Sequence, residues 1–389
     1  MRGGVKMEIA ILGTRGIPAR YGGFETFAEK LAAGLSAHGI DVTVFCEAGE
    51  SFTQEVHLGA KLRYISAPAL GPLQTILYDF KCLWVARRGY DVVYMLGYGA
   101  AFFCLIPRLW GTEVWINPDG IEWARAKWGF FAKCYFRIME WCSLYAANRI
   151  IADAEAIAAN LAERHGRMKN CAVIRYGCEV VDSPPSSDSL AEWHLIPRSY
   201  YLIVCRLEPE NHVREILQAF QKSGSRRDLI VVGNHLAGNC YVKELRALND
   251  PRIRMIGTVY DQDKLTSLRY HSFAYIHGHS VGGTNPSLLE AMGCGNLVFA
   301  NDNPFNRETL GPCGYYFADA EELTNAIQAA ESNEANLEQR RDASKKRACA
   351  DYRWADIVSQ YLALLEEVAA RGGNRSGTDL RFAAKTLMP

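Results

Sequence analysis

The sequence predicts an α/β protein with two Rossmann-like, doubly wound domains that face each other across a central cleft. Strand-like apolar segments alternate with helix-like amphipathic segments along nearly the whole chain, a pattern typical of parallel sheets covered by helices on both faces. The length of 389 residues favours two domains over one. A stretch of Pro, Ser and Asp at residues 181–189 interrupts the alternation and predicts a linker.

The first domain is predicted to span residues 7–182. Residues 8–13 (EIAILG) have the pattern of a buried strand, and a glycine-rich loop and an amphipathic helix follow them. The further strands predicted in this half are residues 41–46, 61–67, 91–96, 112–117, 149–152 and 171–174.

The second domain is predicted to span residues 198–350, with the same rhythm of strands and helices. Residues 355–369 form an amphipathic pattern with no strand after it, so we expect a helix in residues 351–370 that packs back toward the first domain. Residues 371–389 are expected to be a flexible tail. The predicted strands of this half are residues 200–205, 228–233, 252–257, 273–277 and 297–300.

Composition limits the class of protein. Lys and Arg together number 43, as do Asp and Glu, so no overall attraction to nucleic acid is expected. The 12 cysteines are scattered without zinc spacing, which fits buried thiols in a reducing compartment. The N-terminus lacks the apolar core of a signal peptide, and the longest apolar stretch, residues 92–106, is shorter than the ~20 residues of a membrane span. We expect a cytoplasmic protein, either soluble or peripheral at the inner face of the membrane.

Two glycine-rich motifs, residues 13–16 (GTRG) and 21–24 (YGGF), flank the first strand-to-helix connection. Glycines let a backbone approach a ligand closely, and a helix N-terminus offers unpaired N–H groups to an anion. These motifs predict phosphate or substrate contact, with a purely structural turn as the alternative, and their spacing argues against a dinucleotide site. The candidate residues are Arg15, Gly16, Gly22 and Gly23.

Arg206 opens the segment 206–211 (RLEPEN), directly after the first predicted strand of the second half. An arginine at the carboxyl end of a strand faces the cleft and can hold a diphosphate by charge-assisted hydrogen bonds. The alternative is a solvated arginine that pairs with Glu208 or Glu210.

Residues 278–292 combine a strand end, a Gly-Gly turn and a helix with Pro286 in its first turn. The N–H groups of this helix suit a second phosphate or a sugar oxygen. Glu290 lies about one turn into the helix among apolar neighbours. It is therefore a candidate acceptor of hydrogen bonds from a ribose, with an ordinary helix glutamate as the alternative.

Polar residues just past the predicted strands of the first half are candidates for the chemistry in the cleft. Asp119 and Asp153 can also be turn or helix-cap residues, and Glu25 is a weaker candidate. The candidates themselves are Asp119, Glu122, Asp153 and Tyr176.

Residues 123–141 interleave aromatic and basic side chains. A helix of this composition can lie in an anionic membrane interface, or its aromatic rings can pack between the domains. The predicted acceptor- and membrane-contacting residues are Trp123, Arg125, Lys127 and Trp128.

Four motifs in this order resemble family-4 retaining glycosyltransferases, and among them the bacterial rhamnosyltransferase subgroup that builds surface polysaccharides. The resemblance covers about residues 8 to 370. The motifs that carry it are GTRGIP with YGGFET, NPDGIEW (residues 117–123), RLEPEN, and HSVGGTNPSLLEAMGCG (residues 279–295).

The resemblance implies a GT-B fold, a nucleotide-sugar donor bound by the second domain, an acceptor bound by the first, and no metal or other cofactor. Arg206 would bind the donor diphosphate and Glu290 the ribose, and Glu208 lies on the same donor side. The amides of Gly283, Thr284 and Asn285 would approach the phosphates or the sugar.

The sequence departs from the family pattern at two positions. Asn211, also on the predicted donor side, stands where a basic residue is usual, and Gly282 stands where the first glutamate of a pair is usual. Neutralisation of the diphosphate would then rest on Arg206, the loop amides and Arg15.

The resemblance thus implies transfer of rhamnose from dTDP-rhamnose to a lipid-linked saccharide, in the assembly of an exopolysaccharide, capsule or lipopolysaccharide at an anionic membrane. Two alternatives remain: the same fold with a UDP- or GDP-sugar donor, and a catalytically silent sugar-nucleotide-binding protein.

Overall fold

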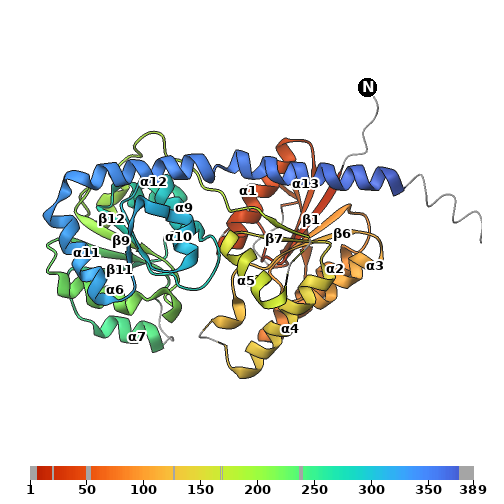
Figure 1. Cartoon of the computed structure of the whole chain (residues 1–389), viewed down its shortest axis with the longest axis horizontal. Helices are drawn as coiled ribbons and strands as arrows, with labels where there is room; N and C mark the ends of the chain where they lie inside the picture. Colours follow the sequence, from red (N-terminus) through yellow and green to blue (C-terminus); the bar gives the residue numbers. More distant parts are fainter. Residues whose placement is uncertain are drawn as a thin grey trace, which may run out of the picture.

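The computed structural model describes residues 7–19, 22–49, 54–125, 128–166, 168, 170–235 and 240–375. Two α/β domains lie side by side, and two successive C-terminal helices run along them (Figure 1): residues 337–351 on the second domain and residues 354–375 on the first. Each domain contains one sheet with helices on both faces, which confirms the predicted pair of doubly wound domains.

The sheet of the first domain has the strand order β3-β4-β2-β1-β5-β6-β7-β8. Its pairs are parallel except for β3 with β4. The two-residue β3 was not predicted, since so short a segment has no periodicity. The strands are β1 (Glu8–Leu12), β2 (Asp41–Glu47), β3 (Val56–His57), β4 (Ala60–Ile65), β5 (Val92–Leu96), β6 (Glu113–Asn117), β7 (Arg149–Ala152) and β8 (Cys171–Val173).

Helices cover both faces of this sheet because alternate strand residues are apolar on both sides. Ile9 and Ile11 of β1 pack into one core, whereas Ala10 and Leu12 pack into the other. The helices of this domain are α1 (Gly23–Ala37), α2 (Pro72–Val85), η1 (Ala101–Cys104), α3 (Leu105–Leu109), η2 (Glu122–Ala124), α4 (Phe130–Ala146) and α5 (Glu155–His165).

The second sheet is wholly parallel, with the order β11-β10-β9-β12-β13-β14. The strands are β9 (Tyr200–Val204), β10 (Asp228–Val232), β11 (Ile253–Gly257), β12 (Ala274–His277), β13 (Val298–Asn301) and β14 (Tyr315–Phe317). The helices are η3 (Asp188–Trp193), η4 (Pro209–Asn211), α6 (Val213–Ser223), α7 (Cys240–Ala247), α8 (Gln262–His271), α9 (Pro286–Gly293), α10 (Pro304–Leu310), η5 (Gly311–Cys313), α11 (Ala320–Ser332), η6 (Glu334–Asn336) and α12 (Leu337–Asp351).

Both sheets reverse their winding direction next to their first strand. β1 lies between β2 and β5, and β9 lies between β10 and β12. Parallel sheets of this kind bind ligands in the crevice outside the carboxyl ends of the strands at that reversal. The two crevices face each other, because a side chain on Gly120 after β6 would lie 2.3 Å from the Cα of Gly282 after β12.

The long helix α13 (Trp354–Arg375) leaves the second domain and packs on α1 and the first sheet (Figure 1). The hydroxyl of its buried Tyr361 shares a 2.8 Å hydrogen bond with that of Tyr94. Gly34 of α1 lets the helices approach, since a Cβ there would lie 2.4 Å from Val358.

The predicted tail was placed too early in the chain. α13 continues through residue 371 to Arg375, because Arg371 forms ion pairs with Glu113 of the first domain and with Glu367 one turn earlier. Residues 376–389 lie outside the described residues. None of the helices in the described ranges is long and apolar enough to cross a bilayer.

Asp79 of α2 gives the fold a pH dependence. Its side chain is buried, and burial raises its pKa to about 7. The folded state therefore holds this proton more tightly than the unfolded state, so stability is lost as pH rises from about 4 to 7. We predict that Asp79→Asn removes a loss of about 1.4 kcal/mol per pH unit in this window.

Urea unfolding of the wild type and of Asp79→Asn across this pH range measures the effect. Asp342→Asn, on an exposed position of α12, is the control. Parallel pH profiles for the wild type and Asp79→Asn would contradict the prediction.

Candidate active site

The loop after β1 is fixed by glycines at the edge of the cleft. Gly13 has φ +86°, and a Cβ there would lie 2.1 Å from the carbonyl oxygen of Leu96 at the end of β5. A Cβ on Gly16, with φ +113°, would lie 2.6 Å from the sulfur of Cys46. Only glycine fits these positions, so the loop is held close to the carboxyl ends of three strands.

Arg15 and Glu25 form the first part of the site. The backbone N–H of the exposed Arg15 donates to Oε1 of Glu25 at 3.3 Å. Burial raises the pKa of Glu25, whereas the positive charges of Arg15 and Arg206 lower it. The positive charges of two arginines from different domains therefore act on the carboxylate of Glu25. Glu25 thus lies closer to the centre of the candidate site than the sequence indicated.

Glycines also shape the start of α1. Gly22 is the N-cap residue with φ +107°. A Cβ on Gly23 would lie 3.1 Å from Cγ of Pro286, in the first turn of α9. The N-terminus of α1 thus lies directly against the N-terminus of the predicted donor-binding helix.

Arg206 extends from the carboxyl end of β9 with a side chain that is 44% exposed. Its Nη2 lies 3.7 Å from Oε2 of Glu208, which is beyond hydrogen-bonding distance. The buried Asn211 donates through Nδ2 to the carbonyl oxygen of Arg206 at 2.7 Å. Asn211 therefore shapes the loop that carries Arg206, and its amide points into that loop.

Asp119 and Arg125 face Arg206 from the first domain. Asp119 has a left-handed backbone with φ +56°, and its N–H donates to Oδ1 of Asn117 at 2.7 Å. Its carboxylate lies 3.6 Å from Nη2 of Arg125. Burial raises the pKa of Asp119, and the charges of Arg125 and Arg206 oppose this shift.

Arg125, predicted to contact the acceptor or the membrane, lies inside the cleft beside Asp119. Its side chain is 13% exposed, and its Nε lies 2.6 Å from Oε2 of Glu122. Burial lowers the pKa of Arg125, but nearby carboxylates, with Glu122 and Asp119 the strongest, raise it above its usual value. The cleft thus contains a fixed cation from each domain.

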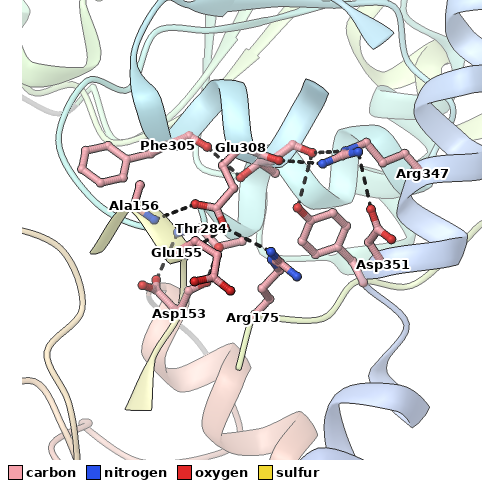
Figure 2. A network of polar contacts seen from close by, with 11 residues as sticks. Asp153, Glu155, Ala156, Arg175, Thr284, Phe305, Glu308, Arg347 and Asp351 are labelled. Carbon is pink, nitrogen blue, oxygen red and sulfur yellow. Dashed lines mark hydrogen bonds and ion pairs between the residues drawn. The ribbon is translucent and has the colours of Figure 1, made fainter. Parts of the chain in front are cut away.

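Asp153 joins the domains at the start of α9 (Figure 2). Oδ2 of this fully buried side chain accepts from the N–H of Thr284 at 3.1 Å, and its carbonyl oxygen accepts from the Thr284 hydroxyl. A Cβ on Gly283 would lie 2.1 Å from Oδ1 of Asp153. Burial raises the pKa of Asp153 well above its usual value.

Glu308 of α10 makes a second contact across the domain boundary (Figure 2). Helix α5 of the first domain begins after Ala154, which offers no side-chain cap. The Glu308 carboxylate accepts the backbone N–H groups of Glu155 and Ala156, both at 2.8 Å, and lies 3.3 Å from Nη2 of Arg175. The second domain thereby supplies the cap that α5 lacks.

Glu290 lies in α9, and Asn285 is the residue directly before the helix. Oδ1 of Asn285 accepts from the N–H of Ser287 at 3.0 Å and caps the helix. Glu290 forms an ion pair with the buried Arg269 of α8, and its side chain remains 30% exposed. The carboxylate is therefore held in place by Arg269 and is still partly accessible to solvent.

Three predicted residues are fixed by packing or by hydrogen bonds. The ring of Tyr176 is buried 4.7 Å from the ring of Phe27, and its hydroxyl accepts from Nδ2 of Asn117 at 3.4 Å, at the end of β6. Burial raises the pKa of Tyr176, and the negative charges of Asp153 and Asp119 raise it further, so the hydroxyl lies beside the cleft carboxylates. The indole N–H of Trp123 donates to Glu140 at 3.0 Å, and that of Trp128 donates to Glu122 at 2.9 Å. Lys127, the remaining membrane candidate, lies outside the described residues.

No role was predicted for His277, the last residue of β12, or for His279, which follows the strand. His277 and His279 stack with their ring centroids 4.4 Å apart. Burial lowers the pKa of His277 to about 3 and that of His279 well below its usual value, where Arg206 and Arg125 also contribute. Both rings are therefore neutral at pH 7. The position of His279 in the same motif as Gly283 was the signal for its place at the cleft.

No group of three or more His, Cys, Asp or Glu side chains within the described ranges is arranged to hold a metal ion. The polar residues of the cleft are arginines, isolated carboxylates, neutral histidines and backbone amides. Such groups can bind an anionic ligand and support charge on a leaving group.

Two families match the chain in sequence. Residues 6–179 match a domain of unknown function (DUF1972), and residues 196–348 match glycosyl transferases group 1. A comparison with the curated proteins found no match.

Solved structures share the architecture over nearly the whole chain. A sucrose-phosphate synthase from Thermosynechococcus elongatus has a TM-score of 0.80 at 18% identity, covering 94% of this chain and 100% of its own. HepE from Anabaena, solved with UDP and glucose, has a TM-score of 0.75 at 19% identity, covering 93% and 100%. A trehalose 6-phosphate synthase from Burkholderia multivorans has 0.70 at 13%, covering 94% and 99%. The fold is GT-B, and with the group 1 domain the protein is a glycosyltransferase.

We predict that Glu308→Ala loosens the contact between the domains. Loss of the cap on α5 should lower the free energy of unfolding by about 1–2 kcal/mol. It should also raise the radius of gyration in small-angle X-ray scattering, because an interdomain contact is lost with the cap.

A second variant separates the two effects. Ala154→Ser added to Glu308→Ala restores a local cap, so stability should recover while the scattering stays expanded. An unchanged radius of gyration in Glu308→Ala would show that Glu308 does not hold the domains together.

Proposed function

We propose that this GT-B glycosyltransferase transfers rhamnose from dTDP-rhamnose to a lipid-linked saccharide, with retention of anomeric configuration and without a metal. The acceptor would be an intermediate of surface-polysaccharide assembly, and the enzyme would work at the cytoplasmic face of the membrane. The observation that carries the proposal is Arg206, a half-exposed cation at the switch point of the second sheet, opposite Asp119 and Arg125.

The chemistry needs support for the departing nucleoside diphosphate. Arg206 supplies a guanidinium whose carboxylate neighbour is 3.7 Å away, so its donors suit a diphosphate. Preorganised positive charge at a leaving group is commonly the largest catalytic contribution of a protein. Arg15 of the first domain is a second exposed cation. Like Arg206, it acts on the carboxylate of Glu25.

The acceptor hydroxyl would pass its proton to the departing phosphate on the same face of the sugar. This route needs no pair of carboxylates, in contrast to glycoside hydrolysis. Asp119 is the acceptor-side group that the geometry favours, because its carboxylate lies within the field of Arg206 and Arg125. Glu290 would bind the ribose with the carboxylate edge that Arg269 leaves exposed.

The neighbouring structures favour one alternative donor. HepE crystals contain UDP, or UDP-glucose, so a UDP-sugar is the second candidate. A donor panel distinguishes the two: purified protein is incubated with dTDP-rhamnose, UDP-glucose, UDP-GlcNAc and GDP-mannose, and slow hydrolysis and thermal stabilisation are followed. A selective response to dTDP-rhamnose supports the proposal, and a response to another nucleotide sugar alone would reject rhamnose as the donor sugar.

We predict that Arg206→Ala lowers kcat/KM on the order of 10²-fold or more, because a contact that strengthens on the leaving group is lost. Circular dichroism should show that the fold survives, since the side chain is half-exposed. Arg214→Ala, at an exposed arginine of α6, is the matched control. Wild-type rates in Arg206→Ala would reject the assigned role.

A further inference from the structure

Helix α4 presents an apolar stripe to solvent. Phe131, Ile138, Trp141 and Tyr145 recur at helical spacing, with exposed fractions of 87%, 57%, 52% and 59%. A surface helix of a soluble protein normally turns its polar residues outward. The polar Glu140 instead lies on the inner side of α4 and is 2% exposed. The usual polarity of the inner and outer helix faces is therefore reversed at these positions.

The stripe is part of a larger surface, made by α2, η1, α3 and α4 with the residues next to their ends. Eleven of the fifteen large apolar side chains exposed in the described residues lie there, so their clustering needs an explanation. Ring contacts link its parts: Phe80 with Trp84 and with Phe103, and Trp84 with Trp110. Arg108 of α3 donates to the carbonyl oxygen of Tyr145 and joins α3 to α4.

The charges on this surface have one sign. The acids of these four elements are Asp79 and Glu140, and both are buried. Arg87 and Arg88 lie over the rings of Trp84 and Trp110, at 4.4 and 5.7 Å. The basic residues on or beside the four elements are Lys81, Arg87, Arg88, Arg108, Lys133 and Arg137.

We infer that this aromatic–basic face docks the protein on an anionic lipid bilayer. Exposed aromatic rings bury at the headgroup boundary, and flanking Lys and Arg are attracted to anionic lipids. A surface that remains in water would not be expected to combine exposed aromatic rings with exclusively basic charges over four elements. This face would be the surface through which the enzyme of the proposed function binds the membrane, so it rests on that function. It does not include Trp123 and Trp128, which are turned inward.

The face also has a useful position. α4 begins only a few residues after Arg125, which contacts Asp119 in the cleft. A protein docked through this face would hold the cleft near the bilayer. A lipid-linked acceptor could then reach Asp119 while its lipid stays in the membrane.

Vesicle flotation tests the inference with the full-length protein. The wild type should float with vesicles of phosphatidylcholine and phosphatidylglycerol, and weakly with phosphatidylcholine alone. Phe131→Ser combined with Ile138→Ser should lower the partition coefficient about tenfold or more. Arg88→Gln should lower it about fivefold. High salt should weaken binding to the anionic vesicles.

Ile196→Ser combined with Tyr260→Ser is the matched control, because both residues are exposed apolar side chains of the second domain. Its partitioning should equal that of the wild type. Failure of the wild type to bind anionic vesicles would overturn the inference, as would equal losses in the control. A surface that instead makes a dimer, abolished by Phe131→Ser with Ile138→Ser, would also overturn it. Hydrolysis of the donor in solution reports the proposed function separately, since vesicle binding needs no donor.

Discussion

The buried carboxylate of Asp153 is the contact on which the cleft depends. It lies between the domains with no exposure to solvent and accepts the N–H of Thr284. Burying a carboxylate is costly unless it is fully hydrogen-bonded, and Oδ1 has no hydrogen-bond partner among the described residues. Because of this cost the pKa of Asp153 is raised, and the raised pKa favours the protonated carboxyl group. The position of the loop at residues 283–285 is therefore set by the first domain.

This contact changes how an anion can be bound. The amide of Thr284 already donates to Asp153, and the amide of Ser287 donates to Asn285. In this arrangement the helix N-terminus would contribute less to the binding of a phosphate than its sequence motif indicates, and the arginines would contribute more. The neutrality of His277 and His279 fits the same picture: burial opposes the protonation of both rings, and Arg206 and Arg125 also oppose that of His279. Positive charge in the cleft is carried by groups that do not titrate near pH 7.

The fold was predictable because apolar strands and amphipathic helices alternate in two long runs, on either side of the linker at residues 181–189. The strands that the sequence missed, β3 and β14, have two and three residues, and segments this short carry only a weak periodic signal. The loops after β1, β9 and β12 were predictable as cleft loops, because parallel strands deliver their carboxyl ends to one edge. A place after a strand does not fix how exposed a side chain is, however: the ring of Tyr176 is buried, and its hydroxyl contacts Asn117. The contact of Glu308 with α5 joins residues 153 apart in the chain and leaves no local signal.

The segment from Asn117 to Ala146 shows how one stretch of chain serves two surfaces. The aromatic and basic composition of this segment was visible in the sequence. Which residues face the cleft and which face outward depends on the turn at η2 and on where α4 begins. Trp123 and Trp128 are fixed inward by hydrogen bonds to Glu140 and Glu122, and these two acids would otherwise repel an anionic membrane. With the acids paired inward, α4 keeps only apolar and basic side chains outside. The hydrogen bonds that build the cleft wall therefore also determine the charge of the outer face.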